Sequence, residues 1–472
     1  METKIIIDSR LKLMNISNQL VHWLSESLTF ENPLYLEAVK RGRYIRNISP
    51  NIKLYSETPN GIVIPRGYLQ TIEEILIGKG NDISIIDNRV FNKPIHDIES
   101  NIVLRDYQSK AKTDLLRHPN GMLVAPAGSG KTIMGLDIFC TLKQNMLWLT
   151  HTNRLADQVK ERILGNNDMP PAIPSITEED IGMIGSGKKK ITNKITIGMI
   201  QTLVRNLDLL IEISQEFGLI IIDEAHHVPS STFLKVINYL PSYYMFGLTA
   251  VPYRRDGLEN VMFASIGRLN SVVQRKTVKK EEGIITPTAV IRKIYGQKYD
   301  DNDYSFAVSE ILMKDKERCN MIVHDIVNEA KNGNFCIAIS VRKLYCEIIY
   351  NKIINYWNKT GIATGDYNKK HNDLQVKRLE EGDISVLITT FNLLGEGFDV
   401  RKLNRGFLIL PFREKSRVEQ AIGRIQRPSD GKTDAYFYDY VDNNVGILRN
   451  QFMSRQKAYR SLGVKILNDN NG

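Results

Sequence analysis

The chain of 472 residues is 42% hydrophobic and 25% charged, a composition that excludes a mainly disordered, collagenous or membrane-embedded protein. Its 63 lysines and arginines outnumber its 53 acidic residues, and the net charge of +10 fits either a polyanionic partner or solubility alone. No apolar run reaches the roughly 18 residues that cross a bilayer, and the N-terminus lacks the features of a secretory signal. We therefore expect a protein that stays inside a cell and has no membrane partner.

The first hundred residues differ in pattern from the rest of the chain. Turn signals at 31–33, 49–51 and 58–61 separate short runs of mixed composition. This pattern predicts a small α+β accessory domain over residues 1–97.

Short apolar runs typical of buried strands begin after residue 100. They are rich in Ile, Leu and Val, and stretches with helical spacing, such as 133–142, lie between several of them. The predicted strands are 121–125, 146–150, 195–200, 219–222, 246–249, 336–340, 385–389 and 406–410. Because strands and helices alternate, we predict an α/β fold with parallel sheets.

These strands fall into two groups that a polar stretch at 274–283 separates. We therefore predict a first α/β lobe over 98–285 and a second over 286–472, the second ending in a helical tail at 445–462.

The four cysteines, Cys140, Cys319, Cys336 and Cys346, are scattered along the chain. None has the spacing of a metal ligand, so we expect reduced and mostly buried thiols.

A glycine-rich loop follows the first predicted strand of the first lobe. It reads Ala125-Pro126-Ala127-Gly128-Ser129-Gly130-Lys131-Thr132 and precedes a helix with an apolar stripe, the setting of a phosphate-binding loop. Backbone N–H groups beside the two glycines would wrap a polyphosphate. Lys131 would reach its terminal phosphates, and the hydroxyl of Thr132 would ligate Mg²⁺. Ala125 stands where the strict pattern has glycine.

Two adjacent carboxylates end another apolar strand. Asp223 and Glu224 follow residues 219–222 and so lie at the C-terminal edge of the sheet, where ligands bind in α/β folds. Asp223 would hold Mg²⁺ through the metal's water shell, and Glu224 would orient or deprotonate the attacking water. His226 and His227 have no second ligand at zinc spacing, so we expect hydrogen-bonding or coupling roles for them.

A third signal lies in the second lobe, in the run Gln420-Ala-Ile-Gly423-Arg424-Ile-Gln426-Arg427-Pro428. Arg424 and Arg427 are three residues apart and are predicted to project from one face of a short helix. That arrangement suits a clamp on phosphoryl oxygens. For this motif alone, a solvated basic helix is the alternative.

In this order and on two α/β lobes, the three motifs resemble those of the superfamily 2 helicases of the DEAH/DExH kind. The segments 105–108, 151–158, 199–203, 247–257, 389–390 and 395–399 match further motifs of that family. The resemblance covers about residues 100–440. It implies two tandem RecA-like lobes, ATP and Mg²⁺ as cofactors, and a nucleic acid as the partner.

The resemblance also implies roles for individual residues. It assigns nucleotide binding to Arg105, Tyr107, Gln108, Ala127, Gly128, Ser129, Gly130, Lys131, Thr132, Gly397, Asp399 and Gln420. It assigns contact with the nucleic-acid backbone to Arg154, Gln201, Thr202, Thr389 and Thr390, and coupling to His226, Thr249 and Ala250. Catalysis falls to Lys131, Asp223, Glu224, Arg424 and Arg427.

Two positions depart from the family's pattern. Val251 stands where the family usually has threonine after Thr249-Ala250, a change that would alter coupling without removing catalysis. His151-Thr152 stands where many relatives carry Pro-Thr.

The form of residues 247–257, with Leu28-Thr-Phe30-Glu-Asn32-Pro33 and Ile64-Pro65-Arg66-Gly67, is similar to one repair-type branch of the family. That branch includes the Rad25/XPB-type helicases and the phage UvsW-type branch-migration helicases, and the compact length favours the phage-like members. The protein would then be cytoplasmic, in the host cytoplasm if a phage encodes it.

This branch implies an ATP-dependent DNA helicase or translocase that remodels forks, displacement loops or four-way junctions in recombination, repair or replication. ATP would lie in a cleft between the lobes, and each cycle of closure would shift the grip on the strand. Residues 1–97 would recognise DNA structure, with a stabilising cap on the first lobe as the alternative. A duplex translocase without strand separation and an RNA helicase stay open as functions. The sequence shows no heptad run, so a monomer is the default expectation.

Overall fold

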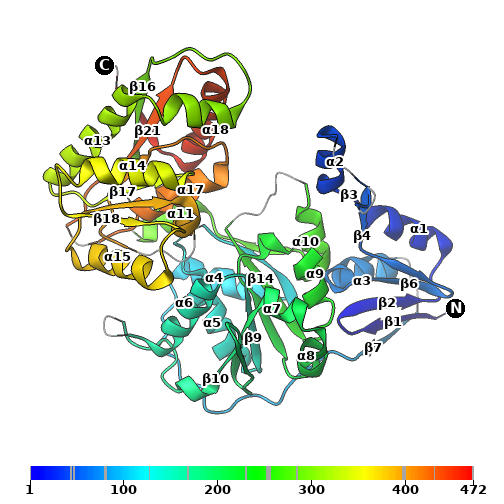
Figure 1. Ribbon diagram of the computed structural model, residues 1–472. Helices are drawn as coiled ribbons and strands as arrows, with labels where there is room; N and C mark the ends of the chain where they lie inside the picture. Colours follow the sequence, from blue (N-terminus) through cyan, green and yellow to red (C-terminus); the bar gives the residue numbers. More distant parts are fainter. Residues whose placement is uncertain are drawn as a thin grey trace. The chain divides into compact units, whose positions relative to one another are not determined.

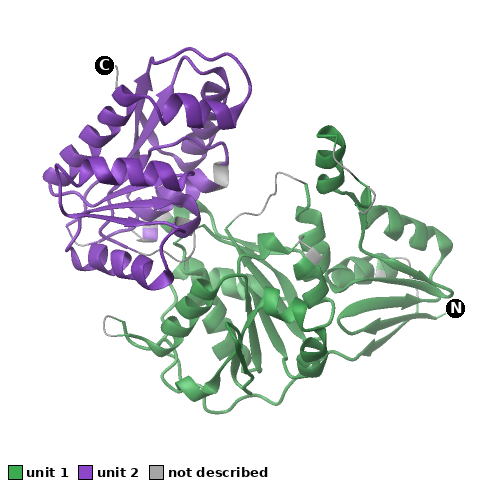
Figure 2. Cartoon of the chain, viewed as in Figure 1, with its two compact units in different colours: residues 1–278 green, residues 279–472 purple. Residues whose placement is uncertain are grey.

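A computed structural model describes the chain except for residues 1, 43–44, 46–47, 79–81, 127, 167–168, 229–230, 251–256, 283–284, 396–399, 430 and 470–472. The chain divides into two compact units, residues 1–278 and residues 279–472 (Figure 2). Helix α11 (Arg275–Glu282) lies within the polar stretch at 274–283, and the division between the units falls within this helix.

The first hundred residues form a small module with its own sheet. In spatial order its strands are β5 (Ser56–Thr58), β6 (Gly61–Pro65), β2 (Arg10–Met14), β1 (Thr3–Ile7) and β7 (Ile83–Asp87). The helices are α1 (Asn18–Ser27), α2 (Pro33–Lys40) and α3 (Leu69–Gly78), and β3 (Thr29–Glu31) pairs with β4 (Asn51–Lys53) in a second, two-stranded sheet. Alternate residues of β1 and β2 are buried, because only one face of this sheet is covered by the apolar core.

The first lobe is an eight-stranded sheet that is parallel except at one edge (Figure 1). In spatial order its strands are β11 (Lys188–Lys190), β10 (Ile181–Gly185), β12 (Ile195–Met199), β9 (Met146–Thr150), β13 (Leu219–Ile222), β14 (Tyr244–Thr249), β8 (Asn120–Val124) and β15 (Leu269–Val272). The main strands are buried along their whole length, as expected where helices cover both faces of a parallel sheet.

Helices pack on both faces of this sheet. The helices of the lobe are α4 (Asp106–Leu115), α5 (Lys131–Leu142), α6 (Asn153–Leu164), α7 (Ile200–Arg205), α8 (Leu207–Glu212), α9 (Ser231–Ile237) and α10 (Glu259–Ile266). Apolar residues of α7 to α10 share one core with Leu147 and Leu149 of β9. Trp148, between them, points to the other face and lies against Gly135 of α5, where a Cβ would approach its ring to 2.7 Å.

The N-terminal module and the first lobe are joined by a buried arginine. Arg66 donates hydrogen bonds to the carbonyl oxygens of Ser242 (2.6 Å) and Tyr243 (3.0 Å), just before β14. It lies in the short helix η1 (Arg66–Tyr68), and the core of the module also includes Leu258 and Val261 at α10. The module is therefore part of the first compact unit rather than a separate body.

The second unit is a seven-stranded sheet in which all neighbouring strands are parallel. In spatial order the strands are β18 (Thr360–Ala363), β19 (Val386–Thr390), β17 (Cys336–Ser340), β20 (Arg405–Leu408), β21 (Tyr436–Asp442), β16 (Thr288–Ile294) and β22 (Lys465–Asp469). Its α-helices, α11 apart, are α12 (Tyr304–Phe306), α13 (Lys316–Lys331), α14 (Lys343–Ile353), α15 (Lys369–Glu381), α16 (Phe391–Gly395), α17 (Lys415–Ile425) and α18 (Gly446–Leu462). A π-helical turn, η5 (Ala307–Leu312), precedes α13.

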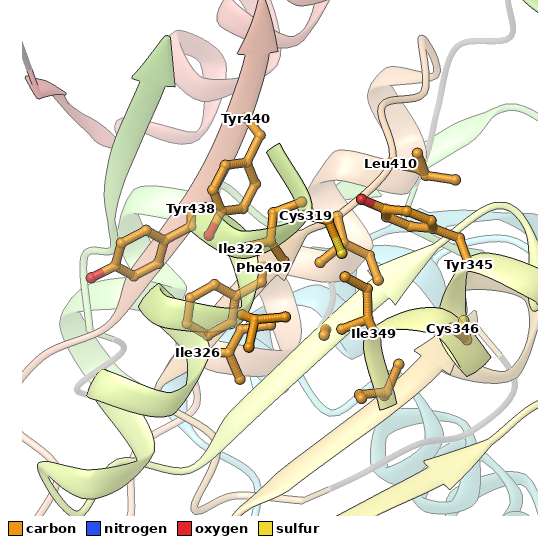
Figure 3. Packing of buried hydrophobic residues seen from close by; sticks show 14 of the residues in the cluster. Cys319, Ile322, Ile326, Tyr345, Cys346, Ile349, Phe407, Leu410, Tyr438 and Tyr440 are labelled. Carbon is orange, nitrogen blue, oxygen red and sulfur yellow. The ribbon is translucent and has the colours of Figure 1, made fainter. Parts of the chain in front are cut away.

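One face of this second sheet carries a large aromatic and aliphatic core (Figure 3). Phe407 of β20 and Tyr438 of β21 stack with ring centroids 4.6 Å apart, and Cys319 and Cys346 are buried in the same cluster. All four cysteines are free thiols, and only Cys140 is not fully buried. Among the described residues, no helix is long and apolar enough to cross a membrane.

All eight predicted strands are present, with ends displaced by two residues at most. The tail helix is also present as α18, but the chain then adds β22 to the sheet, which the sequence did not indicate. The mixed α/β class with parallel sheets is confirmed.

Candidate active site

The phosphate-binding loop connects β8 to α5 at the C-terminal edge of the first sheet. Gly128 and Gly130 have left-handed φ angles of 82° and 76°, which residues with a Cβ rarely adopt. Gly130 directly precedes α5, so the amide groups of the loop and of the first helical turn lie at a helix N-terminus, an ordinary site for phosphate. Lys131 Nζ donates to the carbonyl oxygen of Ala125, 3.4 Å away.

Two side chains of α4 hold this loop. The hydroxyl of Tyr107 and the amide of Gln108 donate hydrogen bonds to the carbonyl oxygen of Ser129, at 3.1 Å and 2.9 Å. The oxygen of the Gln108 amide accepts from the backbone N–H of Arg105 at 3.0 Å, which fixes the orientation of the amide. Both side chains are nearly buried. Tyr107 and Gln108 therefore brace the loop directly, whereas their contact with a nucleotide stays a prediction.

The acid pair follows β13 at the same edge of the sheet. Asp223 is buried, and its carboxylate accepts a 3.0 Å hydrogen bond from the backbone N–H of Glu224. Glu224 has φ 49° and ψ 50°, a left-handed conformation that costs about 1–3 kcal/mol for a residue with a side chain. This conformation breaks the extended backbone directly after Asp223.

The two carboxyl groups have opposite protonation tendencies. Burial, reinforced by the adjacent carboxylate of Glu224, raises the pKa of Asp223 above its usual range. Burial alone would also raise the pKa of Glu224, but Lys131 and His226 outweigh it and hold that pKa below its usual range.

These tendencies suit a divalent cation at Asp223, because a cation stabilises the charged form of a buried carboxylate. Among the described residues, no group of three or more His, Cys, Asp and Glu side chains forms a metal site. Mg²⁺ usually takes one or two carboxylates and fills its remaining positions with phosphate oxygens and water. Asp223 and Thr132 therefore fit the predicted Mg²⁺ without further protein ligands.

A histidine of the acid segment connects two strands. Nδ1 of His226 lies 3.2 Å from a carboxylate oxygen of Glu224 and 3.1 Å from the hydroxyl of Thr249. Thr249 is the buried last residue of β14, next to β13 in the sheet. His226 thus links the acid pair with the strand that leads into the predicted coupling segment, and Ala250 directly follows that strand.

Three imidazole rings follow one another from this contact, with their planes tilted by 37° and 52°. His226 and His227 have ring centroids 4.2 Å apart, and His227 and His151 have centroids 4.4 Å apart. His151 follows β9, and Thr152 caps the N-terminus of α6 by accepting a hydrogen bond from the Leu155 N–H. The contact of His151 was not foreseen, and its only signal in the sequence was the departure from the usual Pro-Thr pair.

The residues predicted to bind nucleic acid in the first lobe lie at this same edge. Arg154 is in the first turn of α6 after β9, and Gln201 and Thr202 are in the first turn of α7 after β12. Strands β12, β9, β13, β14 and β8 are consecutive in the sheet. Their C-terminal ends therefore bring these residues to the sheet edge that carries the acid pair and the phosphate-binding loop.

The second unit holds the other predicted backbone contacts. Thr389 and Thr390 end β19, and both are buried, with 2% and 9% exposure. The Thr389 hydroxyl donates to the carbonyl oxygen of Thr390 at 3.4 Å. These hydroxyls are less accessible than the resemblance implied.

The arginine motif lies at the end of α17. Gln420 and Arg424 are within the helix, but Arg427 follows its last residue, Ile425. The prediction that both arginines project from one face of a helix is therefore wrong. Its physical reason is Pro428, since the residue before a proline is disfavoured in the helical conformation. Burial lowers the pKa of Arg427.

The segment that leads into α17 is held from three sides. Arg318 of α13 donates to the carbonyl oxygen of Ile409 (2.8 Å), and Tyr304 of α12 donates to that of Pro411 (2.7 Å). Arg455 of α18 donates to the carbonyl oxygen of Phe412 at 3.1 Å. After the helix, Lys432 donates to the carbonyl oxygen of Arg427 at 2.7 Å. Side chains from distant parts of the chain thus fix the segment before the arginine helix, whereas a nearby lysine, Lys432, holds the segment after it.

Three predicted nucleotide-binding residues, Ala127, Gly397 and Asp399, lie outside the described residues, as does Val251.

Two family models match the chain. Residues 101–254 match the res subunit of type III restriction enzymes, and residues 316–429 match the helicase conserved C-terminal domain. Between them they include the phosphate-binding loop, the acid pair and the arginine motif.

Individual proteins are similar over most of the chain. A protein of Acanthamoeba polyphaga mimivirus named as an ATP-dependent RNA helicase is 25% identical over 90% of this chain and 79% of its own. The DNA 3'-5' translocase XPB2 of Sulfurisphaera tokodaii is 26% identical over 74% of this chain and 84% of its own. The structure of S. cerevisiae Dbp5 bound to RNA and ADP BeF3 matches 80% of this chain and 90% of its own, with 16% identity and a TM-score of 0.56.

The Dbp5 likeness supports the fold alone, whereas the family models and the sequence relatives cover the chemical motifs. Together they show what kind of enzyme the site serves. The chain belongs to the superfamily 2 helicases, it is an ATP-dependent enzyme with two RecA-like lobes, and its sequence relatives include proteins named as XPB and Rad25.

Proposed function

We propose that the protein is an ATP-dependent DNA motor that remodels branched DNA, by migrating the branch point of forks, displacement loops or four-way junctions. The observation that carries the proposal is the single sheet edge of the first lobe. The phosphate-binding loop and the acid pair follow two strands of this sheet. The two helices that are predicted to contact nucleic acid follow two other strands, and all four strands end at this edge. The S. tokodaii relative, named as a DNA translocase, favours DNA.

In this proposal, the first lobe binds the nucleotide. The loop amides and Lys131 hold the phosphates, while Arg105, Tyr107 and Gln108 order the nucleotide end of the loop. Thr132 and Asp223 would hold Mg²⁺, which neutralises charge on the phosphate oxygens when it is bound. Glu224, whose pKa is held low by Lys131 and His226 against the effect of burial, stays ionised and can orient the attacking water or accept its proton.

The second unit is proposed to complete the reaction. Arg424 and Arg427 would stabilise the charge that develops on the transferred phosphoryl group, a contribution of about 10³ to 10⁵ in rate for arginine fingers. Gln420, Gly397 and Asp399 would add nucleotide contacts. Arg455, Tyr304 and Arg318 support this role by fixing the segment that aims the arginine helix.

We propose that the protein contacts the DNA mainly at its phosphate groups. Arg154, Gln201 and Thr202 of the first lobe, and Thr389 and Thr390 of the second, would supply it together with backbone amides. A motor that moves along any sequence cannot depend on reading bases, so binding should be tolerant of sequence and sensitive to salt.

Movement is coupled to hydrolysis through His226 in this account. Its imidazole contacts both Glu224 and Thr249. A change of charge at the acid pair would therefore alter the hydrogen bond at the end of β14, next to Ala250. His151 and His227 extend the same contact to the start of α6, where Arg154 lies.

An RNA helicase is the second candidate, because the mimivirus relative is named as one. A strand-separation assay tests both. Wild-type protein and Lys131→Ala are incubated with ATP and either a labelled four-way DNA junction, a DNA duplex or a structured RNA, and the product strands are resolved on gels. We expect the wild type to produce strands from the junction, and we expect Lys131→Ala to produce none. Products from RNA alone would support the second candidate and refute the first.

A further inference from the structure

A cavity of about 370 Å³ opens where the N-terminal module packs against the first lobe. Four aromatic side chains line it: Trp23 of α1, Phe30 of β3, Tyr68 of η1 and Phe263 of α10. Arg268, just after α10, is also part of the lining. Among the described residues that line the cavity, none is Leu, Ile, Val or Met, and none is acidic. The site therefore belongs to neither domain alone.

The walls of the cavity are held in place before anything binds. A Cβ at Gly67 would lie 2.4 Å from the carbonyl oxygen of Ala264, so the η1 backbone packs on α10 as closely as a glycine allows. Arg66, the preceding residue, is the buried side chain that binds the carbonyls of Ser242 and Tyr243. The sequence Pro65-Arg66-Gly67 thus joins the module to the lobe and shapes one wall of the cavity.

The positively charged side chain of the cavity, Arg268, forms an ion pair with Glu74. Arg268 donates to both carboxylate oxygens of Glu74 at 2.6 Å and to the hydroxyl of Thr71 at 2.9 Å. This bidentate pair fixes the plane of the guanidinium and has no net charge as a whole. An anionic phosphate therefore gains little here, whereas an uncharged planar group can stack on the rings and on the guanidinium face.

The chemistry of the lining suits a nucleobase. Aromatic faces with nearby hydroxyl and amide groups, here Ser27, Thr71 and Asn260, are what single-stranded nucleic-acid sites offer to a base. The volume lies at the small end of the ligand-pocket range of about 300–1,000 Å³, which suits one base rather than a folded segment.

We propose that this cavity binds one unpaired base of the DNA at the branch point. The inference rests on the proposed function and assigns to the N-terminal module a specific ligand, a single unstacked nucleobase. It explains how the module could favour branched DNA over a duplex, because bases at a branch are unpaired at far lower cost than bases within a helix.

The test uses a four-way DNA junction with 2-aminopurine as an unpaired nucleotide beside the branch, and a matched duplex without an unpaired base. Full-length wild type, Trp23→Ala, Trp23→Tyr and Trp23→Leu are compared for binding and for quenching of the 2-aminopurine fluorescence. Tyr239→Ala is the matched control, because Tyr239 and Trp23 are both 42% exposed aromatic residues of the first unit. Thermal unfolding checks that each variant is folded.

We expect the wild type and Tyr239→Ala to quench the probe. Trp23→Ala should bind the junction roughly 5- to 150-fold more weakly, the range expected for the loss of one stacked base. Trp23→Tyr, which keeps a ring, should restore most of the affinity, and Trp23→Leu should not. Duplex affinity should change much less in every variant.

Equal junction binding by Trp23→Ala and Tyr239→Ala, or full affinity in Trp23→Leu, would overturn the inference. The inference would also fail if the wild type left the probe unquenched while the same junction stimulated its ATP hydrolysis. In that case the proposed function would still stand. If no DNA stimulated hydrolysis by the wild type, the proposed function would fail, and the inference with it.

Discussion

The buried ion pair behind the arginine helix offers a quantitative prediction. Arg455 is 1% exposed, and its guanidinium donates to both carboxylate oxygens of Asp439, at 2.8 Å and 2.9 Å. The Tyr459 hydroxyl donates to the same carboxylate at 2.7 Å, and Arg455 also donates to the carbonyl oxygen of Phe412. Arg455→Met removes the cation and leaves Asp439 charged in the core.

Breaking a buried pair on one side costs about 3–5 kcal/mol, because the remaining charge is desolvated without compensation. At a urea slope of about 2–3 kcal/mol per M, the unfolding midpoint of the second unit should fall by about 1–2.5 M. The double variant Arg455→Met with Asp439→Asn should recover most of this loss. It leaves no unpaired charge at this position, and the Asn oxygen can still accept from Tyr459.

Urea unfolding followed by circular dichroism measures both variants against the wild type. A midpoint lowered by less than about 0.5 M in Arg455→Met would contradict the expected cost of an unpaired buried carboxylate. So would a double variant no more stable than the single one, since the penalty would then not come from an isolated carboxylate. The ATP turnover of the double variant should remain below that of the wild type, because the carbonyl oxygen of Phe412 has lost the Arg455 donor at the entry to α17.

Three further outcomes follow from the site. Gln108→Ala removes a 2.9 Å hydrogen bond to the phosphate-binding loop and should raise the KM for ATP several-fold. Tyr107→Phe removes a 3.1 Å hydrogen bond to the same loop and should raise the KM less, and steady-state kinetics measure both values. His151→Ala should reduce the DNA-stimulated ATPase rate more than the KM for ATP, and an equal loss of both would contradict a coupling role. Burial, with Arg427 and Arg405 nearby, lowers the pKa of Lys432 to about 8, so the unfolded state holds this proton more tightly. The unfolding free energy of the wild type should therefore rise relative to that of Lys432→Met as the pH increases from 8 towards 10.5, and a flat difference would disprove the shift.

The chemical motifs were predictable because their signals are local. The phosphate-binding loop needs left-handed backbone at Gly128 and Gly130, and the acid pair needs a buried strand before Asp223, so a short segment of sequence contains the whole requirement. The main strands were predictable for the same reason, since both faces are buried and their residues are almost all apolar.

What could not be predicted depends on partners far apart in the chain. Strand β21 carries Asp439 and Asp442, which read as polar surface until Arg455 and Arg318 are seen to pair with them in the core. The contact of Gln108 with the loop likewise joins residues more than one element apart. The four aromatic residues of the cavity come from four elements, and no spacing in the sequence indicates that they meet.

The error at Arg427 was of a different kind. The three-residue spacing favoured one helical face, but the proline that follows outweighs the spacing, and the helix ends at Ile425. Arg427 is then positioned by the loop and by Lys432 rather than by the helix.

The central claim is that ATP hydrolysis at Lys131, Asp223 and Glu224 drives movement on branched DNA. The most direct measurement is the ATP turnover of the wild type and of Lys131→Ala at equal nucleotide concentrations of four-way DNA junction, DNA duplex and structured RNA, together with the junction product strands. We expect the highest turnover, and branch migration, with the junction, and we expect Lys131→Ala to lose both. Turnover that duplex stimulates as strongly, without strand exchange, or that RNA alone stimulates, would contradict it.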